Sequence, residues 1–238
     1  MNANINRRTK FVNLGLKDFK ESWDYQADLF NAILSVKSAN RNLPPEQQQA
    51  TDNYLLFVEH PHVYTLGKNG DASNLLINEQ DLKAAQATYY HINRGGDITY
   101  HGPGQIVGYP VIDLENFFTD IHKYMRLMEE SVILTLKEFG IEAGRVSGLA
   151  GVWVEPENES RARKICAVGV KMSRWVTMHG FALNVNTDMR YFDRIVPCGI
   201  TNKTVTSMER ELGNKQDMDH VSIVLKEKFA RVFEMELL

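Results

Sequence analysis

The sequence predicts an α+β fold, in which helices flank a mixed and largely antiparallel sheet. Two observations lead to this prediction. Apolar residues recur at helical spacing in separate segments near the start, the middle and the end of the 238-residue chain. Between them, short β-branched and aromatic stretches follow one another through turns instead of alternating regularly with helices. Since no internal repeat occurs, we expect a single folded domain over residues 1–238.

Helices are predicted in three regions. Residues 22–37 carry an apolar stripe at helical spacing, made of Trp23, Leu29, Phe30, Ile33 and Leu34. Residues 121–139 carry a longer stripe, and Gly140 follows where a C-terminal cap belongs. Helical periodicity returns at residue 206 and again over residues 219–237. In contrast, residues 40–52 are polar and contain two adjacent prolines, which indicates a surface loop.

Strands are predicted where β-branched and aromatic residues cluster. Residues 54–66 fit two short strands, or one strand with a bulge, because Pro61 interrupts them. Residues 105–114 form another strand, in which Pro110 indicates either an edge position or a bulge. We expect three successive antiparallel strands joined by short loops at residues 149–155, 164–172 and 180–185.

Composition and charge exclude several classes of protein. The formal charge of −3 argues against a general nucleic-acid binder, which would carry a basic excess. No apolar run of the length of a membrane span occurs, and the basic N-terminal residues are not followed by a signal-peptide core. We therefore expect a soluble, cytoplasmic protein that binds neither nucleic acid nor a membrane.

A glycine-rich, polar segment, RGGDITYHGPGQ at residues 94–105, is the first candidate site. It lacks the spacing of a dinucleotide fingerprint and the Gly-Lys-Ser/Thr ending of a phosphate-binding loop, and a strand rather than a helix follows it. The pair His60 and His62 lacks the helical carboxylate partner of a metal site. Glycines also let backbone N–H groups approach a ligand closely, so the segment predicts either an acyl-binding cradle or simple turns.

The two cysteines are too few for a disulfide framework or a four-sulfur metal site. Cys198 lies between a proline and a glycine and is the better candidate nucleophile, whereas Cys166 lies within a predicted strand; both could also be inert. A catalytic thiol needs a neighbouring base or cation. The candidates are His101, His179, Lys164 and Lys171. Strand alternation would point Lys164 and Cys166 to one face, and Ile165, Ala167 and Gly169 to the other.

Three stretches together resemble the lipoyl(octanoyl) transferase family. They are RGGDITYHGPGQIVGYPVIDL at 94–114, KICAVGVKMSRWVTMHGFALNVNTD at 164–188 and IVPCGI at 195–200. The stretch NLGLKDFKESWDYQADLF near the N-terminus is similar as well, so the resemblance covers nearly the whole chain. It implies a fold like that of biotin and lipoate protein ligases, in one catalytic domain.

The resemblance implies transfer of an octanoyl group from octanoyl-acyl carrier protein to the acceptor lysine of lipoyl domains. The lipoyl domains of 2-oxoacid dehydrogenases and the glycine cleavage H protein would be the partners of a monomeric enzyme without metal or cofactor. Cys198 would carry the acyl group, and Lys164 would lower the pKa of its thiol. The substrate pocket would be formed by Arg94, Gly95, Gly96, Asp97, Ile98, Thr99, Tyr100, His101, Ala167, Val168, Gly169, Gly180, Phe181 and Ala182.

Two other functions remain open. A lipoate or biotin protein ligase of the same fold would activate a free acid with ATP and would not need Cys198. A binding module would capture a carrier protein without catalysis. Because acyl carrier proteins are acidic, a basic docking patch is expected, and its candidate residues are Arg161, Arg163, Lys171 and Arg174. The alternative is that these residues form only a solvated charged face.

Overall fold

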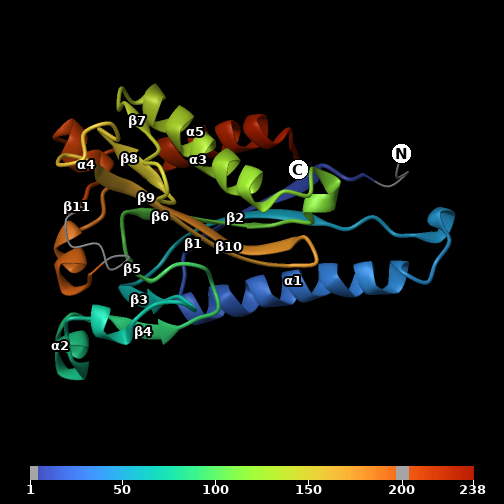
Figure 1. Cartoon of the computed structure of the whole chain (residues 1–238), viewed down its shortest axis with the longest axis horizontal. Coiled ribbons are helices and arrows are strands. Elements are labelled where there is room, and N and C mark those ends of the chain that lie inside the picture. The colour runs from blue at the N-terminus through green and yellow to red at the C-terminus, as the bar shows by residue number, and fades with distance from the viewer. Residues whose placement is uncertain (1–4, 197–203) are drawn as a thin grey trace.

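The computed structural model describes residues 5–196 and 204–238. Its central feature is a mixed sheet with the strand order β12-β1-β2-β6-β10-β9-β8-β7, beside which β11 pairs with β9. Helix α1 covers one face of this sheet, and α3 and α5 cover the other (Figure 1). The predicted fold class is therefore confirmed. The strands are β1 (Arg8–Leu16), β2 (Asn53–Glu59), β6 (Gln105–Val111), β7 (Ala143–Gly144), β8 (Val152–Val154), β9 (Arg163–Ser173), β10 (Val176–Asn184), β11 (Thr204–Val205) and β12 (Glu236–Leu237).

Most neighbouring strands of the central sheet are antiparallel. The succession β8, β9 and β10 is antiparallel, as predicted. Strand β1, which the sequence did not predict, pairs in parallel with both β2 and β12. Its Gly and Asn residues weaken the β signal, and pairing with strands far away in the sequence supplies the missing stability.

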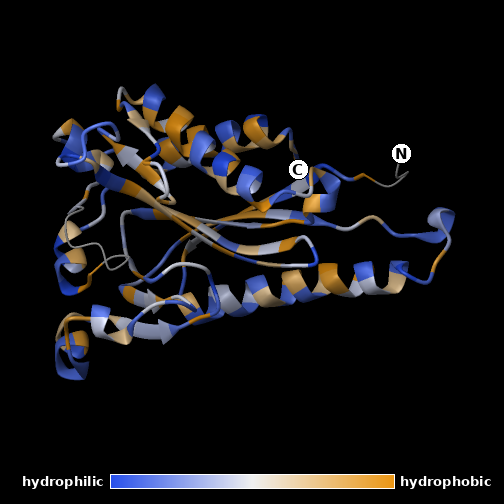
Figure 2. Ribbon diagram, in the orientation of Figure 1, coloured by the Kyte–Doolittle hydropathy of each residue, from blue (hydrophilic) through white to orange (hydrophobic). Residues whose placement is uncertain are grey.

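Helix α1 (Phe19–Asn40) is longer at both ends than the predicted helix. Asp18 caps its N-terminus by accepting hydrogen bonds from the backbone N–H groups of Lys20 and Glu21. Its apolar side includes Phe30 and Ile33, which are buried against the sheet together with residues of β2, β6 and β10. Figure 2 shows apolar residues concentrated on the sheet and on the helices that cover it.

The opposite face of the sheet packs against α3 (Ile121–Glu138) and α5 (Met218–Phe233). Asp120 caps the start of α3, and Gly140 adopts a positive φ of 78° just beyond its end, as the sequence predicted. Helix α4 (Met208–Leu212) precedes α5. Helix α5 is shorter than predicted because Glu234 adopts a left-handed conformation, after which the chain forms β12.

A second, smaller sheet has the order β4-β3-β5 and comprises β3 (Val63–Leu66), β4 (Thr88–His91) and β5 (Ile98–His101). Residues 54–66 thus form two strands, as one of the two readings predicted, but the strands belong to different sheets. The short helix α2 (Glu79–Ala84) precedes β4. The connections include the 3-10 turns η1 (Pro45–Gln47), η2 (Ala72–Asn74), η3 (Leu114–Asn116) and η4 (Met189–Arg194).

Pro110 lies in β6, between β2 and β10, so of the two predicted alternatives, an edge position or a bulge, the edge position is wrong. The pairing of β6 with β10 runs from Gln105 to Gly108 and returns only as an isolated bridge at Asp113. Within this interruption, Thr177 Oγ1 donates a hydrogen bond of 2.8 Å to the Pro110 carbonyl. A proline is tolerated in a central strand here because no ladder bond requires its N–H group.

Within residues 5–196 and 204–238, no helix has the length and apolar character needed to cross a membrane.

Candidate active site

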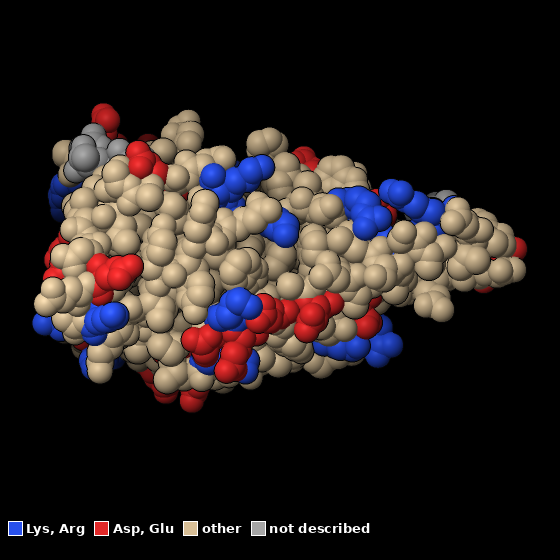
Figure 3. Space-filling view, turned by 90° about the horizontal axis from the view of Figure 1, so that it is seen from below, with Lys and Arg blue, Asp and Glu red and all other residues tan. Residues whose placement is uncertain are grey.

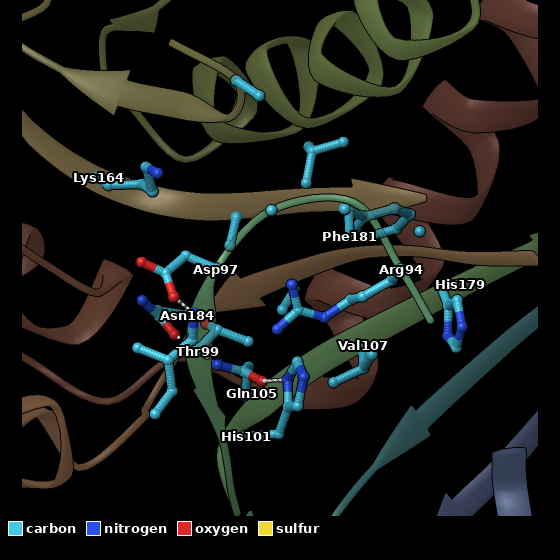
Figure 4. Close-up of a pocket in the computed structure, with 18 of the residues that line it drawn as sticks. Arg94, Asp97, Thr99, His101, Gln105, Val107, Lys164, His179, Phe181 and Asn184 are labelled. Atoms are coloured by element: carbon cyan, nitrogen blue, oxygen red, sulfur yellow. Dashed lines mark hydrogen bonds between the residues drawn. The ribbon is translucent and has the colours of Figure 1, made fainter. Parts of the chain in front are cut away.

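A pocket of about 180 Å³ lies between the central sheet and the segment that enters the second sheet. Alternate residues of β6, several residues of β10 and part of β9 line it. Residues 94–101 and the short loop 148–150 contribute further walls (Figure 4). The pocket is therefore built from segments that are far apart in the sequence.

The glycine-rich segment crosses β9 at very close range. The Gly95 N–H donates a hydrogen bond of 2.9 Å to the Val170 carbonyl, which ties the segment to the strand. A Cβ atom on Gly169 would lie 2.9 Å from the Gly95 carbonyl oxygen. Gly96 also adopts a positive φ of 87°. The glycines at this crossing are thus required by a close backbone approach and a turn, and they bring the segment over the floor of the pocket.

Arg94 holds the segment to the second sheet. Its guanidinium donates hydrogen bonds to the Thr65 carbonyl at 2.7 Å and to the Thr65 hydroxyl at 2.9 Å. It also donates to the carbonyl of Gly95 at 3.0 Å. Although it lines the pocket, Arg94 is 9% exposed, and these bonds fix its position before any ligand enters.

A hydrogen-bonded chain fixes the orientation of His101 (Figure 4). Asn184 Nδ2 donates to the Thr206 carbonyl, so its Oδ1 accepts a 2.8 Å bond from Gln105 Nε2. Gln105 Oε1 then accepts the 2.8 Å bond from His101 Nδ1. The proton of the neutral ring thus lies on Nδ1, which leaves Nε2 as an acceptor. Burial, and next the neighbouring His60, lower the pKa of His101 to about 3, so the ring is neutral at physiological pH.

Lys164 lines the pocket near one end of β9. Its Nζ lies 4.7 Å from the centre of the Trp153 ring, in a cation–π contact. A Cβ atom on Gly151 would lie 3.5 Å from the Lys164 side chain, so the loop before β8 passes directly against the lysine stem. The amine thus reaches the pocket along an aromatic ring and a glycine backbone.

The expected sharing of one strand face by Lys164 and Cys166 is wrong. The pairing of β8 with β9 shifts register between Val152 and Trp153, whose partners are Cys166 and Lys164. This irregularity breaks the simple alternation of side chains. Both Ile165 and Cys166 are buried in the core against α3 and α5, while Lys164 and Ala167 line the pocket. Burial raises the pKa of the Cys166 thiol, so this cysteine is unreactive, as its position in a predicted strand indicated.

The loop at residues 148–150 is anchored from α3 by a fully buried carboxylate. Glu129 Oε1 accepts a hydrogen bond of 2.9 Å from the Gly151 N–H. Its Oε2 accepts bonds from Arg126 at 2.7 Å and from Arg145 at 3.0 Å. Because both oxygens of the buried carboxylate are satisfied, the wall of the pocket beside Lys164 is held rigidly.

Comparison with known proteins connects this geometry to a family. The family model described as "Lipoyl protein ligase A/B catalytic domain" matches residues 21–230. The octanoyltransferase of Cytophaga hutchinsonii is 57% identical over 100% of this chain and 97% of its own length. That of Christiangramia forsetii is 59% identical over 98% of this chain and 99% of its own length. The chain belongs to the octanoyltransferase family. Members of this family are enzymes of the acyltransferase class, and this chain is one of them.

Solved structures support the fold. A bi-partite lipoate protein ligase from Thermoplasma acidophilum superposes with a TM-score of 0.69 at 18% identity, over 97% of this chain and 86% of that chain. At this level of identity the likeness establishes a common fold, and it leaves the reaction to be argued from the site.

The octanoyltransferase pocket brings together most of the predicted substrate-binding residues. Those that line it are Arg94, Gly96, Asp97, Ile98, Thr99, His101, Ala167, Val168, Gly169, Gly180, Phe181 and Ala182. Gly95 lies behind them and bonds to β9, and Tyr100 points away and donates or accepts a 2.7 Å bond with His62. Cys198 lies outside the described residues. That these residues bind substrate, and that Cys198 and Lys164 act together, stay predictions.

Sequence reasoning missed several lining residues, and strand alternation would have found some of them. Gln105, Val107 and Tyr109 alternate along β6, and Asn184 continues the alternation of Gly180 and Ala182 along β10. The remaining ones come from distant segments and have no local signal. They are Phe19, Ile92, Gly148, Leu149, Ala150, Phe192 and Val205. His179, which the sequence indicated only as a candidate base, also lines the pocket.

The four candidate residues of a basic docking patch do not form one cluster. Arg161 and Arg163 form ion pairs with Glu155, and Arg163 also pairs with Glu211. Lys171 and Arg174 lie at the other end of the long strand β9 and in the hairpin turn that follows it. On the face that contains α1, basic and acidic side chains are interspersed (Figure 3). The alternative, a solvated charged surface, describes these four residues better.

Within the described residues, no three His, Cys, Asp or Glu side chains gather where they could hold a metal ion.

Proposed function

We propose that this enzyme transfers an octanoyl group from octanoyl-acyl carrier protein to the acceptor lysine of a lipoyl domain. The observation that carries the proposal is the pocket itself: an apolar cavity, crossed by a glycine-rich segment, with the amine of Lys164 in its wall. Burying an eight-carbon chain there is worth on the order of 5 kcal/mol before ordering costs, at ~0.8 kcal/mol per CH₂. Such a pocket fits an unbranched acyl chain better than a polar metabolite.

In the first half of the proposed reaction, the amine of Lys164 accepts the proton of the Cys198 thiol. The thiolate attacks the octanoyl carbonyl carbon, and the bond from that carbon to the sulfur of the carrier breaks. The leaving thiolate takes the proton from Lys164, which restores the neutral amine. Backbone N–H groups near the reacting carbonyl would stabilise the developing oxyanion. Cys166 is buried in the core, which favours Cys198 as the thiol that reacts.

In the second half, the amine of the acceptor lysine attacks the thioester carbonyl and the carbon–sulfur bond to Cys198 breaks. The amine must first lose a proton, because its ordinary pKa is ~10.4. Lys164, or Nε2 of His101, is the candidate base; His101 is already oriented with its Nδ1 proton directed to Gln105. Since an amide forms from a thioester, the reaction is downhill without ATP.

The lipoyl domains of 2-oxoacid dehydrogenases and the glycine cleavage H protein are the proposed acceptors. We also propose that the enzyme is a cytoplasmic monomer.

Mass spectrometry tests the covalent step. Mixing the protein with octanoyl-acyl carrier protein should add one octanoyl group, and tryptic mapping should place it on Cys198. Cys166→Ala should still be labelled, whereas Cys198→Ser should not. Absence of any mass gain, with tight binding of the carrier, would instead support a binding module. Labelling of a different residue would remove Cys198 from the mechanism.

Steady-state transfer tests Lys164. Lys164→Ala should reduce turnover by ~10²–10⁴-fold, the usual contribution of a general acid–base group. Lys171→Ala is the matched control, because its Nζ packs over the Phe30 ring and does not line the pocket, and it should stay within about threefold of wild type. Near-normal turnover of Lys164→Ala would contradict the assigned role.

The competing ligase activity is tested with octanoic acid and ATP, and product formed without any thioester donor would favour it.

A further inference from the structure

A continuous chain of hydrogen bonds connects His101 with the strand segment that carries Lys164. The Thr206 N–H, just after β11, donates a bond of 2.9 Å to the Lys164 carbonyl. The Thr206 carbonyl in turn accepts a bond of 3.0 Å from Asn184 Nδ2 on β10. From Asn184 the chain continues through Gln105 to His101, with 2.8 Å for each bond. Two candidate groups for proton transfer, which belong to different sheets, are thus held by one set of bonds.

The donors and acceptors along this chain allow only one arrangement. A backbone carbonyl can only accept, so Asn184 turns its amide nitrogen to Thr206 and its Oδ1 to Gln105. Gln105 therefore donates through Nε2, both to Asn184 Oδ1 and, at 3.2 Å, to the Tyr100 carbonyl. Its Oε1 faces the imidazole, which must donate from Nδ1. Two backbone carbonyls thus determine which nitrogen of His101 carries the proton.

Nε2 is the polar atom of His101 that stays available. The Phe19 ring stacks on the imidazole at 6.1 Å between centroids, and the His60 ring meets it edge-on at 6.0 Å. Within residues 5–196 and 204–238, the fully buried side-chain atoms that lack a hydrogen-bond partner belong to Trp153, His179 and Arg194. Nε2 of His101 also lacks a partner in this part of the chain but is not among these atoms, so it is accessible. The ring lines the pocket, and Figure 4 shows its second nitrogen on the side away from Gln105, so Nε2 opens into the pocket.

An unprotonated nitrogen in this place selects a hydrogen-bond donor. The hydrocarbon chain and the thioester group of an acyl-enzyme contain neither N–H nor O–H, so they cannot satisfy it. The group that brings an N–H to the thioester carbonyl in the proposed reaction is the amine of the acceptor lysine. Burial, and next the neighbouring His60, lower the pKa of His101 to about 3, so the ring is too weak a base to keep a proton at neutral pH. It can therefore hold the amine by a hydrogen bond but cannot serve as the final base.

We propose that Gln105 and Asn184 are positioning residues, which present Nε2 of His101 as the hydrogen-bond acceptor for the attacking amine of a lipoyl-domain lysine. This inference rests on the proposed function. As the neutral amine approaches, one N–H bonds to Nε2, and the lone pair points at the thioester carbon. The carbon–nitrogen bond forms, the carbon–sulfur bond to Cys198 breaks, and the proton that the nitrogen loses passes through Lys164 to the sulfur. His101 leaves the step unchanged, which assigns the role of base to Lys164.

The test measures the two half-reactions separately by intact mass. Gln105→Leu should slow transfer from the isolated octanoyl-enzyme to a lipoyl domain by about tenfold or more, because the Nδ1 proton loses its acceptor and the ring can then protonate Nε2. Octanoylation of the enzyme by octanoyl-acyl carrier protein should stay within about threefold of wild type. Asn116→Leu is the matched control, since it removes another buried amide, which bonds to Thr51 and does not line the pocket, and both of its rates should match wild type. Equal slowing of both half-reactions in Gln105→Leu, or of neither, would overturn the proposal.

A second measurement uses the wild-type protein and needs no turnover. In protein labelled with ¹⁵N-histidine, the ring resonances distinguish a protonated from an unprotonated nitrogen, and the signals of His101 are identified by their absence in His101→Gln. At pH 7, wild type should carry the proton on Nδ1 and none on Nε2, and Gln105→Leu should shift toward the opposite tautomer, whereas Asn116→Leu should not. If wild type transfers octanoyl groups but His101 is protonated on Nε2, the positioning role is wrong and the proposed function stands. If wild type forms no octanoyl-enzyme, the proposed function itself fails.

Discussion

Lowering the pH from 7 to 5 should destabilise the folded protein strongly, because three histidines are buried as neutral rings. His60 bonds to the Lys17 carbonyl and to the Tyr109 hydroxyl, and His101 bonds to Gln105. Burial is the largest cause that lowers their pKa values, to about 4 for His60 and about 3 for His101. The pKa of His179 is likewise lowered to about 3. In the folded protein, none of the three is appreciably protonated at pH 5.

The magnitude follows from the difference in bound protons. In the unfolded chain a histidine has a pKa of ~6.5, so at pH 5 it is protonated while its folded counterpart is not. Because the unfolded state binds more protons, stability is full above about pH 6.5 and is lost as the pH falls toward 4. Each of the three histidines contributes about 2 kcal/mol of loss between pH 7 and pH 5, at ~1.36 kcal/mol per pKa unit. The sum, about 6 kcal/mol, is comparable to the whole stability of many domains.

Urea unfolding at pH 7, 6 and 5 measures this loss. His60→Gln should lose about 2 kcal/mol less than wild type over the same interval, because one of the three linked groups is gone. His122→Gln is the matched control, since His122 is exposed on α3, and it should behave like wild type. A loss of less than about 1 kcal/mol in the wild-type protein between pH 7 and pH 5 would refute the reasoning.

Two substitutions test the packing that positions the pocket. Gly180→Ala should lower the free energy of unfolding by about 1–3 kcal/mol, because its Cβ would lie 2.2 Å from the Gly108 carbonyl oxygen. Gly95→Ala should lower it less, because the nearest atom to its Cβ would be the Val170 carbonyl oxygen at 3.4 Å. Equal urea midpoints for the two variants would contradict this expectation. Glu129→Ala should cost about 1–3 kcal/mol, because it leaves the buried Gly151 N–H unpaired and removes a carboxylate partner from the partly exposed Arg126 and Arg145. The half-exposed neighbour Glu130 forms an ion pair with Arg145 at the surface, so Glu130→Ala should cost under about 1 kcal/mol. Similar melting temperatures for the two glutamate variants would show that burial does not set the cost.

Local patterns predicted the elements whose stability is local. The helix over residues 121–139 is found almost as predicted, because its apolar stripe and its glycine terminator are both encoded within it. The strands of residues 164–172 and 180–185 are also present, extended by a few residues at their ends. In contrast, β1 and the second sheet were not predicted, since each depends on partners elsewhere in the chain.

The sequence by itself determined the family and two of the segments that line the candidate pocket, which are the glycine-rich stretch at 94–105 and the stretch around Lys164. Only the tertiary structure decided which side chains meet. It placed Pro110 in a central strand and separated Lys164 from Cys166 through an irregularity in the pairing of β8 with β9. The physical reason is that spacing along the chain encodes periodicity and local hydrogen bonds, whereas strand register and close backbone approach depend on long-range packing.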